Sequence, residues 1–346
     1  MNSVEELAQR GVRRALVIGD GGWGTALAIL LARKGIATTL WSAFLEQADE
    51  LRETRENRRF LPGVPLPEGI AFSADAYSAS EGIDLAISAV PTQFLRKVAE
   101  LFEDALPGYV PIVSATKGLE VETLHRPSRI LADVLGERPI CVLSGPSHAE
   151  EVGRLKPASV VAASGDPALA RLVQATLCCD TFRVYTSDDE VGVELGGALK
   201  NVIAIAAGIS DGLELGDNAK AALLTRGMVE MARFGQARGA RIETFFGLAG
   251  IGDLVTTCCS RHSRNRSVGE AIGRGATLEE VLAGMKSVAE GVWTTKALFG
   301  PEAELGAALM PIASEVHAIL FEGKDPRGAV LDLMRREPVA EMQGFG

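Results

Sequence analysis

The sequence of 346 residues is poor in the residue types that build disulfide frameworks and metal sites. It holds five cysteines and four histidines. No CxxC pair occurs, and four of the cysteines form two pairs of immediate neighbours, a spacing that fits neither a disulfide framework nor a zinc site. We therefore expect reduced thiols and no bound metal ion.

Long hydrophobic runs are also missing. No apolar stretch approaches the roughly 18 residues of a membrane span, and the opening residues, MNSVEELAQRGVRR, contain no apolar signal core. The formal net charge of -10 argues against a nucleic-acid partner. These absences predict a soluble, cytoplasmic protein with no membrane span.

The first half of the chain alternates short β-type runs with helical patterns. The candidate strands are residues 15–19, 37–41, 83–90, 109–116, 139–145, 158–164 and 181–186. Several are continuous apolar runs, which is typical of strands covered on both faces. Helical patterns lie between them, for example at 25–34 and 92–106. This alternation predicts an α/β fold with a doubly wound, mainly parallel sheet.

The strand signal stops at about residue 188, and helical spacing dominates the rest. It is clear in 193–212 and 218–239, and Thr277 with Glu280 forms a capping-box pattern ahead of another helix. Length alone suggests about two domains. We predict a Rossmann-type dinucleotide-binding domain over 1–188 and an all-helical substrate-binding and catalytic domain over 189–346.

Residues 14–25, RALVIGDGGWGT, carry a possible dinucleotide site. Gly19, Gly21 and Gly24 fit the pattern G-x-G-x-x-G directly after an apolar run and before a helical one. In that context the glycines permit a tight turn, a close approach to a pyrophosphate and close helix–strand packing. The helix N-terminus would add free N–H groups for the phosphates. The alternative is a glycine-rich turn that binds nothing.

The choice between NAD and NADP stays open at this stage. A dinucleotide fold usually has an acidic residue at the end of the second strand, for the adenosine ribose. Here Ser42 and Ala43 occupy that place, and neither is acidic or basic. Glu46 is close in sequence but falls on the next helical pattern.

Polar residues follow other candidate strands, and a ligand of an open α/β sheet sits at the carboxyl ends of its strands. Lys117 ends one strand, and the segment SGPSHAEE, with Gly145 and Ser147, follows another. An anionic ligand would explain the lysine. A solvated loop lysine and a serine that caps a helix are the alternatives.

A lysine also interrupts the apolar helix pattern of 193–212. Lys200 stands among alanine, leucine, valine and isoleucine, where loss of hydration favours a proton donor and acceptor near neutral pH. The same segment contains Gly196, Gly197 and Gly208, which weaken a helix unless another element packs very close to it. A lysine on the solvated face of the helix is the alternative.

Three arginines gather in SRHSRNR, residues 260–266, which follows Asp253 in the sequence. Arg261, Arg264 and Arg266 suit a phosphate or carboxylate, with Ser263 and Asn265 as further donors. A basic surface loop and a nucleic-acid arm are the alternatives. A small phosphorylated substrate fits the short patch best.

Taken together, these segments resemble a known family. GDGGWGTALA, NRRFLPGVPLP, SATKGLE, SGPSHAEE, GGALKNVIAIAAGISDGL, GIGDLVTTC and SRNR occur in this order. Over residues 14–330 the chain resembles the bacterial-type NAD(P)-dependent sn-glycerol-3-phosphate dehydrogenases. The resemblance implies a homodimer that interconverts dihydroxyacetone phosphate and sn-glycerol 3-phosphate with NAD(P)H and so supplies glycerophospholipid synthesis.

The resemblance also implies roles for individual residues, with Lys200 as the catalytic proton donor and acceptor at the C2 oxygen. The residues implied to bind the substrate are Lys117, Gly145, Ser147, Lys200, Asp253, Ser263, Arg264 and Asn265. Those implied to bind the cofactor are Gly19, Gly21, Gly22, Trp23, Gly24, Lys117, Ala149, Arg264, Val288 and Glu290. The chain departs from the family at Gly22, where serine is common, at His148, where phenylalanine is common, and at Ala43, where a basic residue is often found.

Two other functions compete with this one. A dehydrogenase of β-hydroxy or keto acids would also use a lysine on a helix, but it would not need an arginine cluster for a phosphate. A dinucleotide sensor without enzyme activity would keep Gly19–Gly24 but has no need of Lys200, Asp253 and Arg264. Residues 55–69 suit either a closing loop or a static crossing rich in turns.

Overall fold

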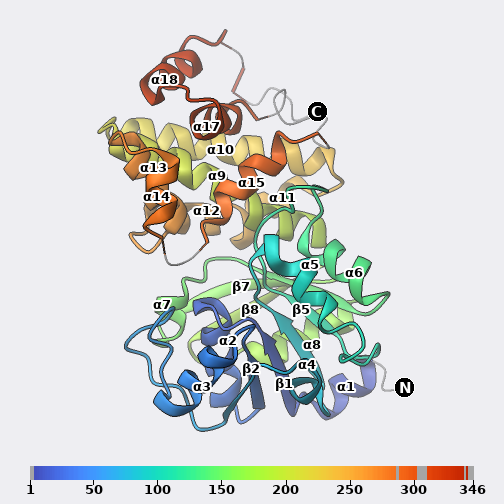
Figure 1. Cartoon of the computed structure of the whole chain (residues 1–346). Coiled ribbons are helices and arrows are strands. Elements are labelled where there is room, and N and C mark those ends of the chain that lie inside the picture. The colour runs from blue at the N-terminus through green and yellow to red at the C-terminus, as the bar shows by residue number, and fades with distance from the viewer. Residues whose placement is uncertain (1–3, 286–287, 302–309, 339, 342–346) are drawn as a thin grey trace. The chain divides into compact units, whose positions relative to one another are not determined.

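The computed structural model describes residues 4–285, 288–301, 310–338 and 340–341 (Figure 1). The chain divides into two compact units. The sheet unit comprises Met1–Lys117 and Arg126–Glu190, and the helical unit comprises Gly118–His125 and Val191–Gly346. Each unit has its own hydrophobic core.

The sheet unit is built on one sheet of eight strands in the order β3-β2-β1-β4-β5-β6-β7-β8. The strands are β1 (Arg14–Ile18), β2 (Ala37–Trp41), β3 (Ile70–Ser73), β4 (Leu85–Ser88), β5 (Ile112–Ser114), β6 (Ile140–Ser144), β7 (Ala158–Ala163) and β8 (Phe182–Ser187). The β6–β7 pairing is antiparallel and all others are parallel. The prediction of a mainly parallel α/β sheet is confirmed, and the strand order reverses between β1 and β4.

One strand, β3, was missing from the sequence prediction. It is only four residues long, pairs with β2 alone and exposes every second side chain. An edge strand of this kind lacks the continuous apolar run by which the other strands were found.

Helices cover both faces of the sheet. They are α1 (Val4–Arg10), α2 (Gly22–Arg33), α3 (Leu45–Thr54), α4 (Ala76–Ser80), α5 (Thr92–Glu100), α6 (Pro127–Leu135), α7 (Ala149–Val152) and α8 (Pro167–Leu177). Along β1, Ala15 and Val17 belong to one buried cluster with side chains of α2 and α8, whereas Leu16 and Ile18 belong to another with side chains of α5 and α6. This alternation follows from the two-residue period of a strand.

The helical unit surrounds α9 (Glu190–Gly212). Its other elements are α10 (Asp217–Ala237), α11 (Ile242–Phe245), the π-helix η1 (Leu248–Gly252), α12 (Asp253–Cys259), α13 (Arg264–Gly273), α14 (Leu278–Ala283), α15 (Glu290–Leu298), α17 (Pro311–Phe321) and α18 (Pro326–Met334). No strand follows β8 in the described part of the chain. The predicted capping box of Thr277 and Glu280 is present at α14.

Two helical segments are long and apolar enough to cross a membrane by length and composition, Glu190–Gly212 and Ile242–Cys259. The apolar window of the first is 100% buried inside the fold. A buried core helix of a soluble protein passes the same test, so this is weak evidence for a membrane span.

Glycines let α9 and α13 approach until their main chains touch. A Cβ added at Gly208 or Gly212 of α9 would lie 2.0 Å or 2.4 Å from a carbonyl oxygen of α13. A Cβ added at Gly269 or Gly273 of α13 would lie 2.0 Å or 2.6 Å from a carbonyl oxygen of α9. The close neighbour expected from the glycines of α9 is therefore present.

Replacing Gly208 with alanine should lower the free energy of unfolding by about 1–3 kcal/mol, because the new methyl group overpacks a contact between main chains. Chemical denaturation measures this change. Gly284→Ala is the matched control in the same unit, since a Cβ there meets its nearest atom at 3.6 Å. Equal stability of the two variants would contradict the close contact.

Candidate active site

The glycine loop after β1 has the geometry that its sequence predicts. Gly19 has φ +107°, and a Cβ added at Gly24 would lie 1.9 Å from the carbonyl oxygen of Gly19. A Cβ added at Gly21, by contrast, meets no atom of the described residues within 4 Å. Gly19 and Gly24 thus pack against each other, and the main chain at Gly21 is open. A pyrophosphate needs such an opening to approach the main chain.

The first turn of α2 supplies donors beside this opening. Thr25 is the first residue whose N–H bonds back within the helix, to Gly21, so the preceding N–H groups are available to an anion. The indole of Trp23 is partly buried and packs on the core, with its ring centroid 6.3 Å from that of Phe182. The main chain of Trp23 belongs to the first turn of α2.

Gly22 is required by its own neighbours. A Cβ at Gly22 would lie 2.8 Å from the carbonyl oxygen of Phe60 and 3.3 Å from the Cβ of Ala149. A serine at this position would therefore need Phe60 to shift. The same contacts place Ala149, the first residue of α7, beside the glycine loop.

The segment 55–69 is hydrogen-bonded to the glycine loop through Asn57, which is fully buried. Its Nδ2 donates to the carbonyl oxygen of Asp20 and to Thr25 Oγ1, each at 2.7 Å. Its Oδ1 accepts from the N–H of Phe60 at 3.1 Å. The sequence reasoning did not single out Asn57, and nothing in the local pattern marked it.

Three of the predicted substrate residues meet at the same edge of the sheet, beyond β5 and β6. Lys117 Nζ donates to the carbonyl oxygen of Gly145 at 2.8 Å and to Ser147 Oγ at 3.2 Å. Ser147 Oγ donates to the same carbonyl at 2.8 Å. Gly145 has φ +136°, a conformation that favours glycine. The lysine head is therefore held in place at the strand ends rather than solvated on a loop.

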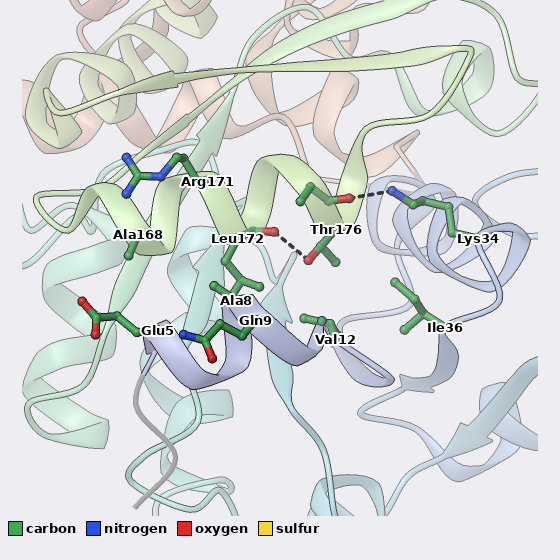
Figure 2. Close-up of a pocket in the computed structure, with 12 residues that line it drawn as sticks. Glu5, Ala8, Gln9, Val12, Lys34, Ile36, Ala168, Arg171, Leu172 and Thr176 are labelled. Atoms are coloured by element: carbon green, nitrogen blue, oxygen red, sulfur yellow. Dashed lines mark hydrogen bonds between the residues drawn. The ribbon is translucent and has the colours of Figure 1, made fainter.

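A cavity of about 640 Å³ lies near the amino ends of β1 and β2, where it is lined by α1, α8 and the residues that precede these two strands (Figure 2). Lys34 and Arg171 both line it, and Lys34 donates to the carbonyl oxygens of Ala175 and Cys178, at the end of α8. None of the predicted site residues lines this cavity. Lys34 serves there as a helix C-cap group.

In the helical unit, Lys200 forms an ion pair with Asp253. The Lys200 Nζ lies 2.5 Å from Asp253 Oδ1, and the side chains are only 7% and 2% exposed. Lys200 is therefore not on a solvated face of α9. A buried lysine is stable only with such a partner, because an uncompensated charge in the interior costs several kcal/mol.

The backbone around α9 brings these two side chains together. Asp253 is the first residue of α12, directly after the π-helix η1. A Cβ added at Gly196, one turn before Lys200, would lie 2.4 Å from the carbonyl oxygen of Ala249 in η1. Glycine at 196 thus lets η1 and the start of α12 reach the helix face that carries Lys200. π-helices occur often at functional sites.

A buried asparagine pair joins α9 to α13 through the residue that follows Lys200. Asn265 Nδ2 donates to Asn201 Oδ1 at 2.9 Å, and Asn265 Oδ1 accepts from the N–H of Gly291 at 2.9 Å. Asn265 of α13 is therefore joined to α9 and to α15. Asn201, next to Lys200 in the chain, is a partner of the predicted residue Asn265 that the sequence did not single out.

The predicted phosphate residues begin α13. Ser263 is its N-cap, and Ser263 Oγ accepts from the N–H of Arg266 at 3.2 Å. Arg264 is exposed, and its guanidinium makes no hydrogen bond or ion pair with a described residue. Of the predicted residues after α14, Glu290 is the first residue of α15 and Val288 lies two positions before it.

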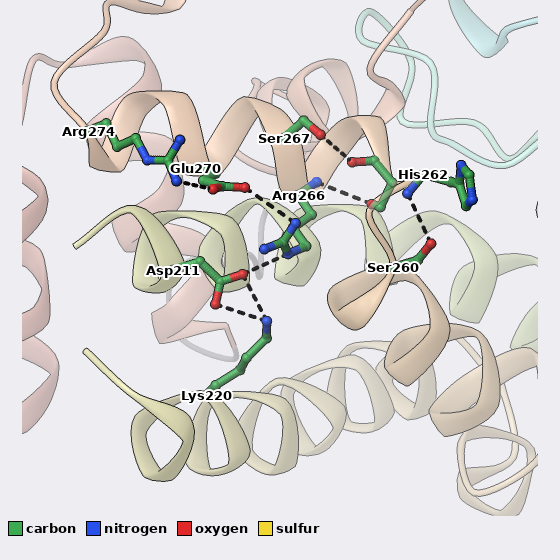
Figure 3. Close-up of polar contacts among 9 residues, drawn as sticks. Asp211, Lys220, Ser260, His262, Arg266, Ser267, Glu270 and Arg274 are labelled. Carbon is green, nitrogen blue, oxygen red and sulfur yellow. Dashed lines mark hydrogen bonds and ion pairs between the residues drawn. The ribbon is translucent and has the colours of Figure 1, made fainter. Parts of the chain in front are cut away.

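Arg266, which the sequence grouped with Arg264, has a different place (Figure 3). Its Nε donates to Asp211 Oδ2 at 2.7 Å, and Asp211 also accepts from Lys220 Nζ at 2.8 Å and 2.9 Å. Arg266 Nη1 further pairs with Glu270 at 3.3 Å. Arg266 therefore joins α13 to α9, and Asp211 joins both to Lys220 of α10. Of these two arginines, Arg264 is the one open to an anion.

Replacing Asp211 with alanine should destabilise the helical unit by about 1–3 kcal/mol, because two half-buried cations lose their acceptor. Asp332→Ala is the matched control: Asp332 pairs with Lys324 at 2.7 Å but is 54% exposed. An exposed pair contributes about 0–1 kcal/mol. Chemical denaturation compares the two variants, and equal effects would contradict a structural role for the Asp211 network.

Comparison with known proteins identifies the family. A model described as the NAD-dependent glycerol-3-phosphate dehydrogenase N-terminus matches residues 14–170, and the corresponding C-terminus matches residues 189–331. These matches cover both the glycine loop of the sheet unit and the ion pair of the helical unit.

Whole-chain relatives agree. A glycerol-3-phosphate dehydrogenase (NAD(P)+) of Geobacter sp. strain M21 is 51% identical over 328 residues, 94% of this chain and 98% of that protein. One from Thermus thermophilus is 51% identical over 330 residues, 95% of this chain and 100% of that protein. A crystal structure of glycerol-3-phosphate dehydrogenase from Coxiella burnetii has a TM-score of 0.89 and 39% identity over 94% of this chain and 99% of that one. The chain belongs to the NAD-dependent glycerol-3-phosphate dehydrogenase family.

Proposed function

We propose that the chain interconverts dihydroxyacetone phosphate and sn-glycerol 3-phosphate through Lys200 as the catalytic proton donor and acceptor. The reaction is that of its family. The observation that carries the assignment of Lys200 is its buried ion pair with Asp253. This ion pair fixes the amine of Lys200 on α9. Glycines of the same helix let the main chains of η1 and α13 pack against it.

NAD(P)H supplies the hydride when it is bound. The loop Gly19–Gly24 and the first turn of α2 would hold its pyrophosphate, with Gly22 and Trp23 contributing main-chain N–H groups. Lys117 and Ala149 of the sheet unit, and Arg264, Val288 and Glu290 of the helical unit, complete the proposed cofactor contacts. The open space at Gly21 supports this assignment.

The protein's own part in the chemistry is proton transfer and stabilisation of charge. As the C2 carbonyl becomes an alkoxide, Lys200 Nζ would give its proton to that oxygen and take it back in the reverse direction. Asp253, which accepts from Nζ, would direct the amine toward the substrate. Lys117, Gly145 and Ser147 would bind the same substrate through the donors at the strand ends.

The start of α13 would hold the phosphate of the substrate. Arg264 is the exposed guanidinium there, and Ser263 and Asn265 stand beside it in the chain. A forked guanidinium binds phosphate oxygens in pairs. Fixing this end of the molecule orients the carbonyl and so lowers the entropic cost of the reaction.

Further proposals rest on the resemblance and the composition. They are a division into a dinucleotide-binding domain over 1–188 and a substrate-binding domain over 189–346, and a homodimer. We also propose that the enzyme is cytoplasmic, that it has no nucleic-acid partner, and that its product sn-glycerol 3-phosphate is used for glycerophospholipid synthesis. Sedimentation analysis of the purified protein tests the dimer.

Lys200→Ala should lower kcat by at least about 100-fold, the lower range of general acid–base contributions. Lys200→Arg should lose as much, because arginine keeps the charge opposite Asp253 but does not release a proton. Steady-state oxidation of NAD(P)H with dihydroxyacetone phosphate measures both variants. The control is Lys296→Ala, an exposed lysine of α15. Turnover of Lys200→Arg close to that of the unaltered enzyme would remove the proposed role.

Arg264→Ala should mainly raise the KM for dihydroxyacetone phosphate, by about 10-fold or more for loss of a charged hydrogen bond. Arg261→Ala is the control, since Arg261 is exposed in the same segment but precedes α13. Unphosphorylated dihydroxyacetone should be a poor substrate for the unaltered enzyme. An unchanged KM in Arg264→Ala would place the phosphate elsewhere.

A further inference from the structure

The sheet unit has a carboxylate at the ribose end of the glycine loop, although the usual position for one is not acidic. In a dinucleotide fold an Asp or Glu at the end of the second strand accepts the 2′-hydroxyl of the adenosine ribose. Here β2 ends at Trp41, and Ser42 follows it. The carboxylate comes instead from Asp20, inside the glycine loop.

Asp20 reaches the end of β2 through a direct hydrogen bond. Ser42 Oγ donates to Asp20 Oδ2 at 2.9 Å, so the carboxylate lies beside the residue at which the usual acid would stand. The other oxygen, Oδ1, receives no hydrogen bond from another described residue. An acceptor is therefore present where the glycine loop and the second strand border the adenosine ribose.

Its surroundings fix this carboxylate in place. The carbonyl oxygen of Asp20 accepts from Asn57 Nδ2 at 2.7 Å and from Thr25 Oγ1 at 3.2 Å. Ser42 Oγ accepts from the N–H of Phe44 at 3.2 Å, which orients the hydroxyl toward Asp20. The first two bonds hold the main chain of Asp20, and the hydrogen bond from Ser42 orients its carboxylate.

Arg59 is the charged residue that acts on the pKa of Asp20. Burial raises the pKa of its carboxyl group, while the hydrogen bond from Ser42 and the positive charge of Arg59 act in the opposite direction. Arg59 is exposed and lies over the ring of Phe60 at 4.9 Å. As a cation, Arg59 would favour the 2′-phosphate of NADP(H), whereas the carboxylate of Asp20 would favour the 2′-hydroxyl of NAD(H).

We propose that Asp20 makes the enzyme select NAD(H) over NADP(H). The carboxylate accepts a hydrogen bond from the 2′-hydroxyl of NAD(H) and repels the 2′-phosphate of NADP(H). It is held at the end of β2 by its hydrogen bond from Ser42. Rejection by a like charge is a common source of specificity. The inference rests on the proposed binding of the cofactor at Gly19–Gly24.

The test is the affinity of the purified enzyme for NADH and for NADPH, measured by fluorescence titration without substrate. We expect the unaltered enzyme to bind NADH at least about 10-fold more tightly, as for one well-placed charge interaction. Asp20→Asn keeps an acceptor for Ser42 but removes the charge, and it should reduce that ratio at least about 10-fold, chiefly by tighter NADPH binding. The ratio of kcat/KM for the two cofactors should follow.

Two further variants make the result specific. Glu46→Gln is the control, because Glu46 is the nearby exposed acid in the first turn of α3, and it should leave the ratio unchanged. If Asp20→Asn folds poorly, Asp20→Ser replaces it. The thermal unfolding midpoint of each variant shows whether it is folded. Tighter binding of NADPH than NADH by the unaltered enzyme, or an equal effect of Asp20→Asn on both cofactors, would overturn the proposal. Failure to reduce dihydroxyacetone phosphate with either cofactor would instead contradict the proposed function.

Discussion

The proposed chemistry depends on one interaction, the buried ion pair of Lys200 with Asp253. Removing one partner of a buried pair typically costs about 3–5 kcal/mol, because the other charge stays in the interior. The pair exists because Gly196 lets the π-helix η1 come within main-chain contact of α9, so that Asp253 begins α12 next to Lys200. The ion pair thereby holds the amine of Lys200 at a defined point of α9, as the proposed proton transfer requires.

The same physical rule, the removal of side chains so that main chains can meet, recurs throughout the chain. Gly208 and Gly269 join α9 to α13, whose first turn carries Arg264. In the sheet unit Gly24 closes the loop onto Gly19, and Gly21 stays open. Polar contacts add to this packing. Asp211 binds Arg266 in the first turn of α13, and Asn57 binds the carbonyl oxygen of Asp20 in the glycine loop. Gly24, Gly196, Gly208 and Gly269 each have a main-chain neighbour at close range, so these glycines let other elements pack against the candidate site residues.

Much of this could be predicted from the sequence, because local patterns report local structure. The apolar runs indicated the sheet, the change of period near residue 188 indicated the helical half, and the interior glycines of α9 indicated a close neighbour. The pairing of Lys200 with Asp253 joins residues 53 positions apart, and only the fold reveals it. The same is true of Asn57 and Asp20, and of Arg266, whose partner Asp211 lies on another helix. The edge strand β3 was missed because half of it faces outward.

The most direct measurement of the central claim is a crystal structure of the enzyme with cofactor and dihydroxyacetone phosphate bound. The account predicts that Lys200 Nζ lies within hydrogen-bond distance of the C2 oxygen, roughly 2.7–3.2 Å, while it still contacts Asp253. It also predicts that the guanidinium of Arg264 contacts the phosphate. A complex in which Lys200 keeps its pair with Asp253 but points away from the C2 oxygen, with another group donating to that oxygen, would contradict it.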